Sequence, residues 1–226
     1  MQAQTIDDVI KCLDDIIAWS HAQNSRLGYF PALYRRVTVQ VKEGIATHYF
    51  DDGARMERLD VLFANRYLDA FEAYRAGQPT TKSWQVAFDA STDWSAIVLQ
   101  HLLLGINAHI NLDLAIAASL TSPGDAIHSL KGDFDKINQI LAALVENVTR
   151  ALTNVWPMLK LLDWIAGKSD DALINFSIDI ARREAWNAAL ELASLDERTA
   201  AQVISRIDEG VALLGHSIQH PGPIIG

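Results

Sequence analysis

A chain of 226 residues, half of them hydrophobic and 21% charged, has enough apolar material for a sizeable core, which excludes a disordered protein. The formal net charge of −9 repels phosphate backbones and anionic lipids, so we expect neither nucleic-acid binding nor membrane association. The single cysteine, Cys12, cannot form an intrachain disulfide, and the first residues lack the pattern of a signal peptide. Together these features predict a cytoplasmic protein.

Helical periodicity and helix-capping residues begin at the start of the chain. Thr5 and Asp8 have the spacing of a capping box, which predicts an amphipathic first helix directly after Thr5. Pro31 is well placed to open a second helix, because its missing N–H would have no partner there in any case. The segment Thr38–Val41 is also typical of a strand, so residues 36–50 are where we expect a hairpin if the protein has one.

The later elements are predicted helices as well. Gly77 is the expected C-terminal cap of the third helix, and the turn at Ser122-Pro123-Gly124 ends the central one. The helix after that turn is expected to break near Gly132, where Asp133 can cap its second part. The predicted spans are 54–76, 83–88, about 93–120, 125–156, Pro157–Gly167, Ser169 to about Ser194, and Asp196 to about Gly215.

These elements predict an all-α fold, a single-domain bundle of about eight or nine helices around a buried central helix. The domain is expected to cover residues 1–226, with an irregular tail from about residue 216. The central stretch Trp94–Leu120 is long enough to span a bilayer, which needs about 20 apolar residues, but its polar residues argue against a membrane span. We therefore expect it in the core, with these apolar residues buried: Leu99, Leu103, Ile106, Ile110 and Leu114.

The polar residues of the central helix lie on two faces. At about 100° per residue, His101, His109 and Asp113 form one arc, and Gln100, Asn107 and Asn111 cluster on the opposite side. Gly105 lies between the two histidines and would leave room beside the helix. That room fits close backbone packing, a water molecule, a metal ion or a ligand.

The next helical segment repeats this pattern. His128 is followed four residues later by Gly132, as His101 is by Gly105, and Asp135 lies two turns from His128. If the two segments pack antiparallel, their imidazoles and carboxylates converge, which is how helical bundles build metal sites. A buried network that only clamps helices together, or a metal-free ligand pocket, explains the same residues.

Our leading functional hypothesis is a metal-dependent hydrolase that acts on a small or phosphoester-type substrate. A divalent metal, zinc or iron, would polarise a substrate oxygen and lower the pKa of a bound water. The candidate metal ligands are His101, His109, His128 and Asp133; the candidate catalytic residues are Asp113, Asp135 and Arg182; and the candidates for binding an unknown small-molecule ligand are Asn65, Arg66 and Asn107. The alternative is a non-catalytic binding or interaction protein whose buried His/Asn/Asp network is structural.

The hydrolase hypothesis makes one sharp geometric prediction. His109 and Asp113 should face a cavity that they share with at least one other charged or imidazole side chain. The candidates for that third group are His101, His128, Asp133, Asp135 and Arg182.

Several segments of the chain also occur together in a known family. They are Phe63-Ala-Asn-Arg-Tyr67, Ser83-Trp84, the run His101–Asp113, Asp133-Phe134 with Ile137-Asn138, and Arg182 with Trp186. With these segments, over roughly positions 25–210, the chain resembles an uncharacterised bacterial family catalogued as domain of unknown function 5995. The resemblance implies a helical single-domain protein with no established activity.

A more distant likeness concerns the zinc-dependent phospholipase C and single-strand nuclease group. In that group a His, a Gly-Asp pair and a second His lie on or near one helix, and His101, Gly105 and His109 are similar to that pattern. Here Ile106 replaces the Asp after the glycine, and the second metal-binding His with its downstream Glu is missing. A shared fold would in any case not give a shared function.

Overall fold

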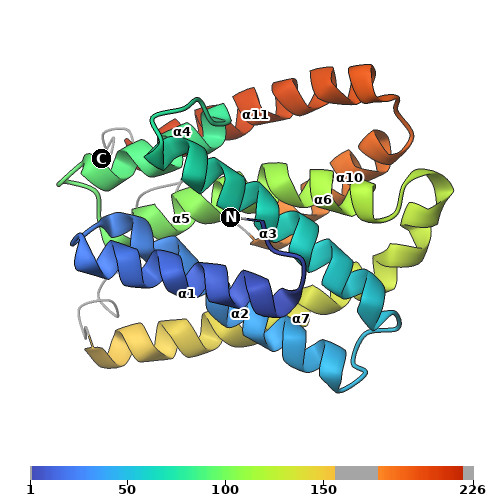
Figure 1. The fold of residues 1–226 in the computed structure, drawn as a ribbon, viewed down its shortest axis with the longest axis horizontal. Helices are drawn as coiled ribbons and strands as arrows, with labels where there is room; N and C mark the ends of the chain where they lie inside the picture. Colours follow the sequence, from blue (N-terminus) through green and yellow to red (C-terminus); the bar gives the residue numbers. More distant parts are fainter. Residues whose placement is uncertain (1, 156–177, 221–226) are drawn as a thin grey trace, which may run out of the picture.

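The computed structural model describes residues 2–155 and 178–220, with the side chains of residues 142–155 left aside, and within these ranges the protein is all-α without a strand (Figure 1). Its α-helices are α1 (Ile6–Ala22), α2 (Tyr29–Ala46), α3 (Gly53–Arg75), α4 (Lys82–Asp89), α5 (Val98–Ala108), α6 (Leu114–Thr121), α7 (Ile127–Val155), α10 (Ile178–Ala193) and α11 (Glu197–Gln219). Four short turns lie between them: the 3-10 turns η1 (Arg26–Gly28), η2 (Ala90–Thr92) and η4 (Gly124–Ala126), and the π-helical turn η3 (His109–Asp113).

The local capping signals act as the sequence predicts at the first helix. Thr5 accepts a hydrogen bond from the Asp8 N–H, and the Asp8 carboxylate accepts one from the Thr5 N–H, which completes the capping box of α1. The hairpin allowed for in residues 36–50 does not form, because α2 continues through Ala46. Thr38 is buried in that helix and its hydroxyl donates to the Tyr34 carbonyl, so this β-branched stretch is accommodated as helix.

Three predicted helix boundaries were wrong. The last helix, α11, continues to Gln219, so residues 216–219 are helical and not part of an irregular tail. α7 continues without a break from Ile127 to Val155, because the Asp133 carboxylate is engaged with the turn before α3 instead of capping a new helix. The central helix begins at Val98, five residues later than 93. The predicted helix Pro157–Gly167 and the predicted cap at Ser169 lie outside the described residues.

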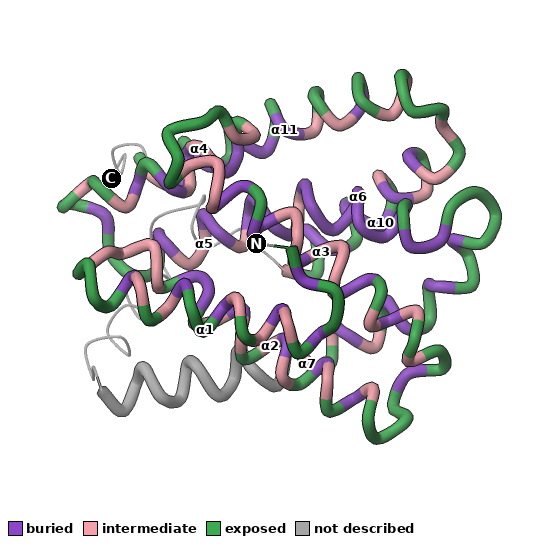
Figure 2. Tube along the Cα trace, viewed as in Figure 1, coloured by how far each residue is buried: buried purple, intermediate pink, exposed green. Residues whose placement is uncertain are grey.

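The central segment consists of α5, η3 and α6, and it lies in the middle of the bundle. α5 contacts α2, α4 and α11, whereas α6 contacts α3, α7 and α10. Figure 2 shows α6 almost entirely in the colour of buried residues. Residues 98–121 are long and apolar enough to cross a membrane, and 78% of their most apolar window is buried inside the structure.

The predicted core positions of the central segment were confirmed only toward its C-terminal end. Ile110 and Leu114 are buried, and Leu103 and Ile106 are half-buried. Leu99 is 44% exposed, which corrects the prediction that it belongs to the core. The reason is that the helix starts late, so Leu99 lies in its first turn at the end of the bundle.

Candidate functional site

The candidate site is built around the π-helical turn η3. A π turn carries one more residue per turn than an α-helix, is rare, and often occurs at functional sites. Here it begins at His109 and ends at Asp113, and both side chains point inward, with 3% and 0% of their surface exposed. The two side chains contact each other through His109 Nδ1 and an Asp113 carboxylate oxygen.

Asp113 receives hydrogen bonds from three side chains. Trp84 Nε1 on α4 donates to one carboxylate oxygen at 2.8 Å, and Arg66 Nε on α3 donates to the other at 3.2 Å. His109 Nδ1 lies 3.2 Å from Asp113 Oδ2. Three segments of the chain, α3, α4 and η3, therefore meet at one buried carboxylate whose charge Arg66 balances.

His109 stands in an aromatic cage. Its ring stacks on Phe63 at a centroid distance of 3.5 Å, and Tyr34 approaches edge-on at 4.5 Å. Burial lowers the pKa of His109, while the hydrogen bond and the charge of Asp113 raise it; the net shift is downward, so the imidazole is neutral near pH 7. A neutral ring that donates from Nδ1 presents an unprotonated Nε2.

Three polar atoms of this cage have no hydrogen-bond partner among the described residues. They are His109 Nε2 and the hydroxyl oxygens of Tyr34 and Tyr67. Burial raises the pKa of both tyrosines, so both hydroxyls keep their protons. An unpaired buried polar atom costs about 1–3 kcal/mol, so the cage stores unfavourable free energy that a bound donor or acceptor would remove.

The position that a Cβ atom of Gly105 would take is filled. A Cβ atom built on Gly105 would lie 2.4 Å from Cδ2 of Phe30, closer than real contacts allow. Of the four explanations for this glycine, the structure supports close packing: the Phe30 ring lies against the helix backbone. Gly132 differs, because the nearest atom to its Cβ position is Asp51 Oδ2, at 3.6 Å.

The predicted metal ligands do not converge among the described residues. No group of three or more His, Cys, Asp or Glu side chains there is arranged to hold a metal ion. His109 lies beside Asp113, whereas His101 packs against Tyr29 at a centroid distance of 5.7 Å, and His128 is exposed on α7. The structure therefore brings His109 and Asp113 together with Arg66, and not with His101 or His128.

Asp133 is buried and fully engaged elsewhere. Its carboxylate accepts hydrogen bonds from the N–H groups of Asp51 and Asp52, at 2.7 and 3.0 Å, and from Arg55 and Lys136, at 3.0 and 3.1 Å. Burial raises the pKa of Asp133, but these hydrogen bonds together lower it by more than burial raises it, so the net shift is downward. The contacts fasten α7 to the turn before α3.

The remaining predicted catalytic residues also have structural partners. Asp135 pairs with Lys131 on the surface of α7. Arg182 on α10 is buried and donates to the Asn138 side chain and, at 2.6 Å, to the Phe134 carbonyl. Burial lowers the pKa of Arg182 to about 10, still well above neutrality, so this side chain is a cation that ties α10 to α7.

The predicted ligand-binding asparagines bind backbone instead. Asn65 exchanges two hydrogen bonds with the backbone of Ala3, at 2.9 and 3.0 Å, which fixes the segment before α1. Asn107 donates to the Val211 carbonyl on α11 at 2.9 Å and accepts from Asn111. The polar face opposite the histidine arc therefore joins the central helix to α11.

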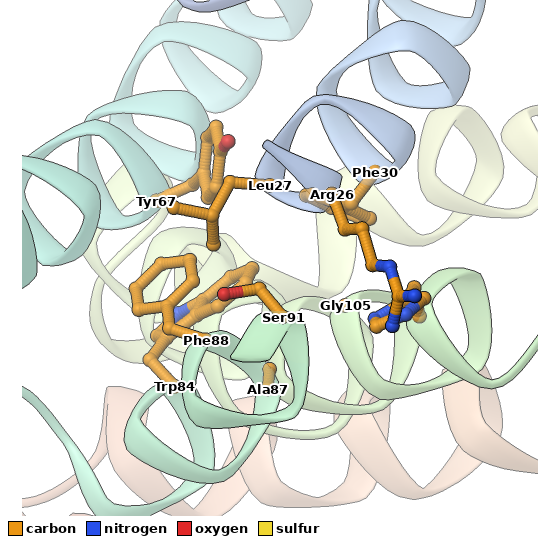
Figure 3. Close-up of a pocket in the computed structure, with 10 residues that line it drawn as sticks. Arg26, Leu27, Phe30, Tyr67, Trp84, Ala87, Phe88, Ser91 and Gly105 are labelled. Atoms are coloured by element: carbon orange, nitrogen blue, oxygen red, sulfur yellow. The ribbon is translucent and has the colours of Figure 1, made fainter. Parts of the chain in front are cut away.

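A small cavity of about 20 Å³ lies at the other end of the histidine arc (Figure 3). His101 and Gly105 of α5 line it together with aromatic rings and with Arg26 of η1. Sequence reasoning did not select Arg26, nor Trp84 as a donor to Asp113. The donor and acceptor of that second pair are 29 residues apart, a separation that leaves no periodic signal.

Comparison with known families supports the resemblance seen in the sequence. The model of a family of unknown function, DUF5995, matches residues 6–221, which confirms that resemblance. Neither a curated protein nor a solved structure matches the chain.

Proposed function

From the premise that the chain belongs to the family of unknown function DUF5995, we propose that it is a non-catalytic binding protein whose buried His109–Asp113 network is structural. The observation that carries this proposal is the closure of the network. Asp113 is completely buried and takes its donors from α3, α4 and η3. Trp84 and His109 lie inside the bundle, and Arg66, whose side chain is 34% exposed, is the partner that reaches solvent.

The energetics of such a network favour a structural role. A buried carboxylate with three donors fixes the positions of the helices that supply them, because removing one partner leaves a charge or a polar atom unpaired in the core. Asn107 on the opposite face and Asp133 on α7 act in the same manner on other helices. Asp113, Asn107 and Asp133 therefore each have a packing role that explains their presence.

The metal-dependent hydrolase is the second candidate, and one observation favours it. His109 Nε2 is a buried, unpaired acceptor at a π turn, and an imidazole nitrogen of this kind is what zinc or iron binds. Asp113 contacts Nδ1 on the other side of the ring, so it would orient the imidazole, and these two described residues would supply a divalent ion with one ligand, His109 Nε2. A small or phosphoester-type substrate would then need an access path to His109.

Metal analysis and stability measurements distinguish the two candidates. We expect the purified native protein to hold no stoichiometric zinc or iron, and His109→Gln to lower the melting temperature without changing metal content. His128→Gln is the matched control, because His128 is exposed and should leave both properties unchanged. One equivalent of zinc or iron in the native protein and in the control, lost in His109→Gln, would overturn the structural assignment.

The proposal includes a cytoplasmic location without nucleic-acid or membrane partners. It is supported by the net charge of −9 and by the single cysteine. Fractionation of cells that express the full chain tests it, and recovery with membranes or with nucleic acid would contradict it.

A further inference from the structure

The cavity beside His101 combines an apolar wall with a few polar groups, as small-molecule sites do. Phe30, Tyr67, Trp84 and Phe88 form the aromatic wall, and Figure 3 shows them on opposite sides of the opening, with the Arg26 side chain extending toward Gly105. The polar groups that line it include Arg26 and His101. The residues come from η1, α2, α3, α4, η2 and α5, so the site is framed by elements that the helical bundle already fixes.

An unpaired polar atom marks this cavity as a place for a ligand. His101 is only 7% exposed, and its Nε2 has no hydrogen-bond partner among the described residues. A volume of about 20 Å³ holds one or two water-sized atoms. A group with one or two oxygen atoms therefore fits, whereas a tetrahedral phosphate is too large.

The charge of the site favours an anion. Arg26 donates to the Asp93 carbonyl and lies over the Trp94 ring at 4.6 Å, and no carboxylate of the described residues forms an ion pair with it. The nearby Asp93 carboxylate instead accepts two hydrogen bonds from Ser95, at 2.9 and 2.7 Å. Arg26 and the Asp93 carboxylate act on each other through charge without an ion pair, so the guanidinium has no direct carboxylate partner among the described residues, and a ligand carboxylate would supply one.

Two large apolar side chains are exposed on the loop that contacts Arg26. Trp94, in contact with Arg26, is 89% exposed, and Ile97, three residues further along the same loop, is 53% exposed. Large apolar side chains exposed together beside a polar site are typical of ligand-binding surfaces. A ligand with a charged head and an apolar body would cover both parts.

We infer that the cavity binds the carboxylate head of a small amphiphilic carboxylic acid, held by Arg26 and His101, while the apolar body of the ligand lies on Trp94 and Ile97. The inference rests on the proposed function as a binding protein and names its ligand class. A carboxylate matches a guanidinium through charge-assisted hydrogen bonds, and its two oxygens fit the available volume.

Binding is expected to take up a proton. Burial and the charge of Arg26 lower the pKa of His101, whereas a backbone hydrogen bond with Ala96 and the charge of Asp93 raise it; the net shift is downward. A free neutral His101 therefore presents an unprotonated Nε2. A bound carboxylate favours the protonated ring, so one proton from solution goes to Nε2 and then donates to the ligand oxygen. Burial raises the pKa of the neighbouring Tyr67, so its hydroxyl keeps its proton throughout.

Titration calorimetry with octanoate tests the inference on the full chain. We expect saturable binding that tightens as pH falls from about 8 to about 6, with heats in buffers of different ionisation enthalpy that report proton uptake. Octanamide, which has the same body without the charge, should bind at least about tenfold more weakly, since charge-assisted hydrogen bonds are the stronger ones.

Variants locate the site. Arg26→Gln and the cavity-filling Ala87→Leu should each weaken octanoate binding by about tenfold or more, and Trp94→Ser should weaken octanoate but not acetate. Arg198→Gln is the matched control, because this substitution removes the same charge from a residue that is exposed on α11. Circular dichroism and melting temperature check that each variant is folded, and Ala87→Leu tests the site with the charge of Arg26 intact.

Two results would overturn the inference: no octanoate binding by the native protein at millimolar concentration, or equal binding by the native protein, Arg26→Gln and Ala87→Leu. Neither result affects the structural assignment of His109 and Asp113, which depends on metal content and stability. Conversely, a metal lost in His109→Gln would overturn the proposed function while leaving octanoate binding to be measured independently.

Discussion

Two buried aspartates, Asp113 and Asp133, have the same side chain and the same complete burial but different surroundings. Asp133 binds two backbone N–H groups and two cations, which completes its hydrogen bonding at the junction of α7 with the turn before α3. Asp113 binds side chains only, inside an aromatic cage where His109 Nε2 has no partner. Complete burial of a carboxylate is therefore compatible with a structural role at both sites, and what distinguishes the Asp113 site is the unpaired His109 Nε2 beside it.

Removing either carboxylate should have the largest effect, and Asp113 should matter more. Asp113→Ala leaves two buried groups, Trp84 Nε1 and His109 Nδ1, without their acceptor and removes the carboxylate partner of Arg66, so we expect a loss of about 3–5 kcal/mol in the free energy of unfolding. Asp133→Ala leaves the Asp51 and Asp52 N–H groups without their acceptor, but the Asp52 side chain still caps α3, so about 1–3 kcal/mol is expected. Urea denaturation of both variants measures the difference. A larger loss for Asp133→Ala would reverse our ranking of the two networks.

Alanine substitution at Gly105 and at Gly132 should change the stability of the protein in opposite directions. Gly105→Ala places a Cβ against the Phe30 ring and should cost about 1–3 kcal/mol, as overpacking does. Gly132→Ala meets no atom closer than 3.6 Å and should stabilise the helix by up to about 1 kcal/mol. Melting temperatures of both variants test this, and Phe30→Leu should partly rescue Gly105→Ala but not affect Gly132→Ala. An equal effect at the two glycines would contradict the assigned packing.

The pH dependence of stability should separate Asp60 from Asp133. Burial, with a contribution from Glu57, raises the pKa of the Asp60 carboxyl to about 8, from 3.8 for a free group. Because the folded state holds this proton more tightly, its stabilising contribution is complete below 3.8 and is lost as pH rises to about 8. The pKa of Asp133 is lowered, so its contribution is present above 3.8 and is lost as pH falls below that value.

Urea denaturation from about pH 3 to about pH 9 tests both signs. Between about pH 5 and about pH 8 the native protein should lose about 1–3 kcal/mol more than Asp60→Asn, which has no carboxyl to ionise. At the acid end, Asp133→Asn should lose less stability than the native protein. Parallel curves for the native protein and Asp60→Asn would show that this carboxyl ionises as easily in the folded chain as in the unfolded one.

The smallest effect is expected at Asp135. Its partner Lys131 lies on the same exposed face of α7, and such surface pairs contribute little. Asp135→Asn should therefore change the free energy of unfolding by less than about 0.5 kcal/mol. A change of several kcal/mol would give this residue a role that its contacts do not suggest.

Much of the fold could be predicted because its signals are local. The capping box of α1 and the N-terminal cap at Asp196 each involve residues three apart, and the pairing of His109 with Asp113 follows from one helical turn. The boundaries failed where distant residues decide them. α7 has no break at Gly132 because Asp133 binds N–H groups more than 80 residues earlier in the chain.

The candidate site was harder to predict for the same reason. The sequence indicated a gap at Gly105, but it could not show that Phe30, on another helix, fills it. It indicated an arc that contains His101 and His109, but the two imidazoles have different neighbours once α2 and α3 pack against the central segment. A helical repeat places residues on a face; which neighbour meets that face depends on tertiary packing.

The extra residue in η3 changes the phase between the two halves of the central segment. Deleting one residue within 109–113 would restore a regular α-helix, but would turn the α6 face by about 100° relative to α5. The side chains of α5 that meet α11 and those of α6 that meet α10 could then no longer be satisfied together. The π turn thus sets the rotation of α6 relative to α5. With that rotation, α5 can pack against α11 while α6 packs against α10, which a uniform α-helix of this sequence could not do.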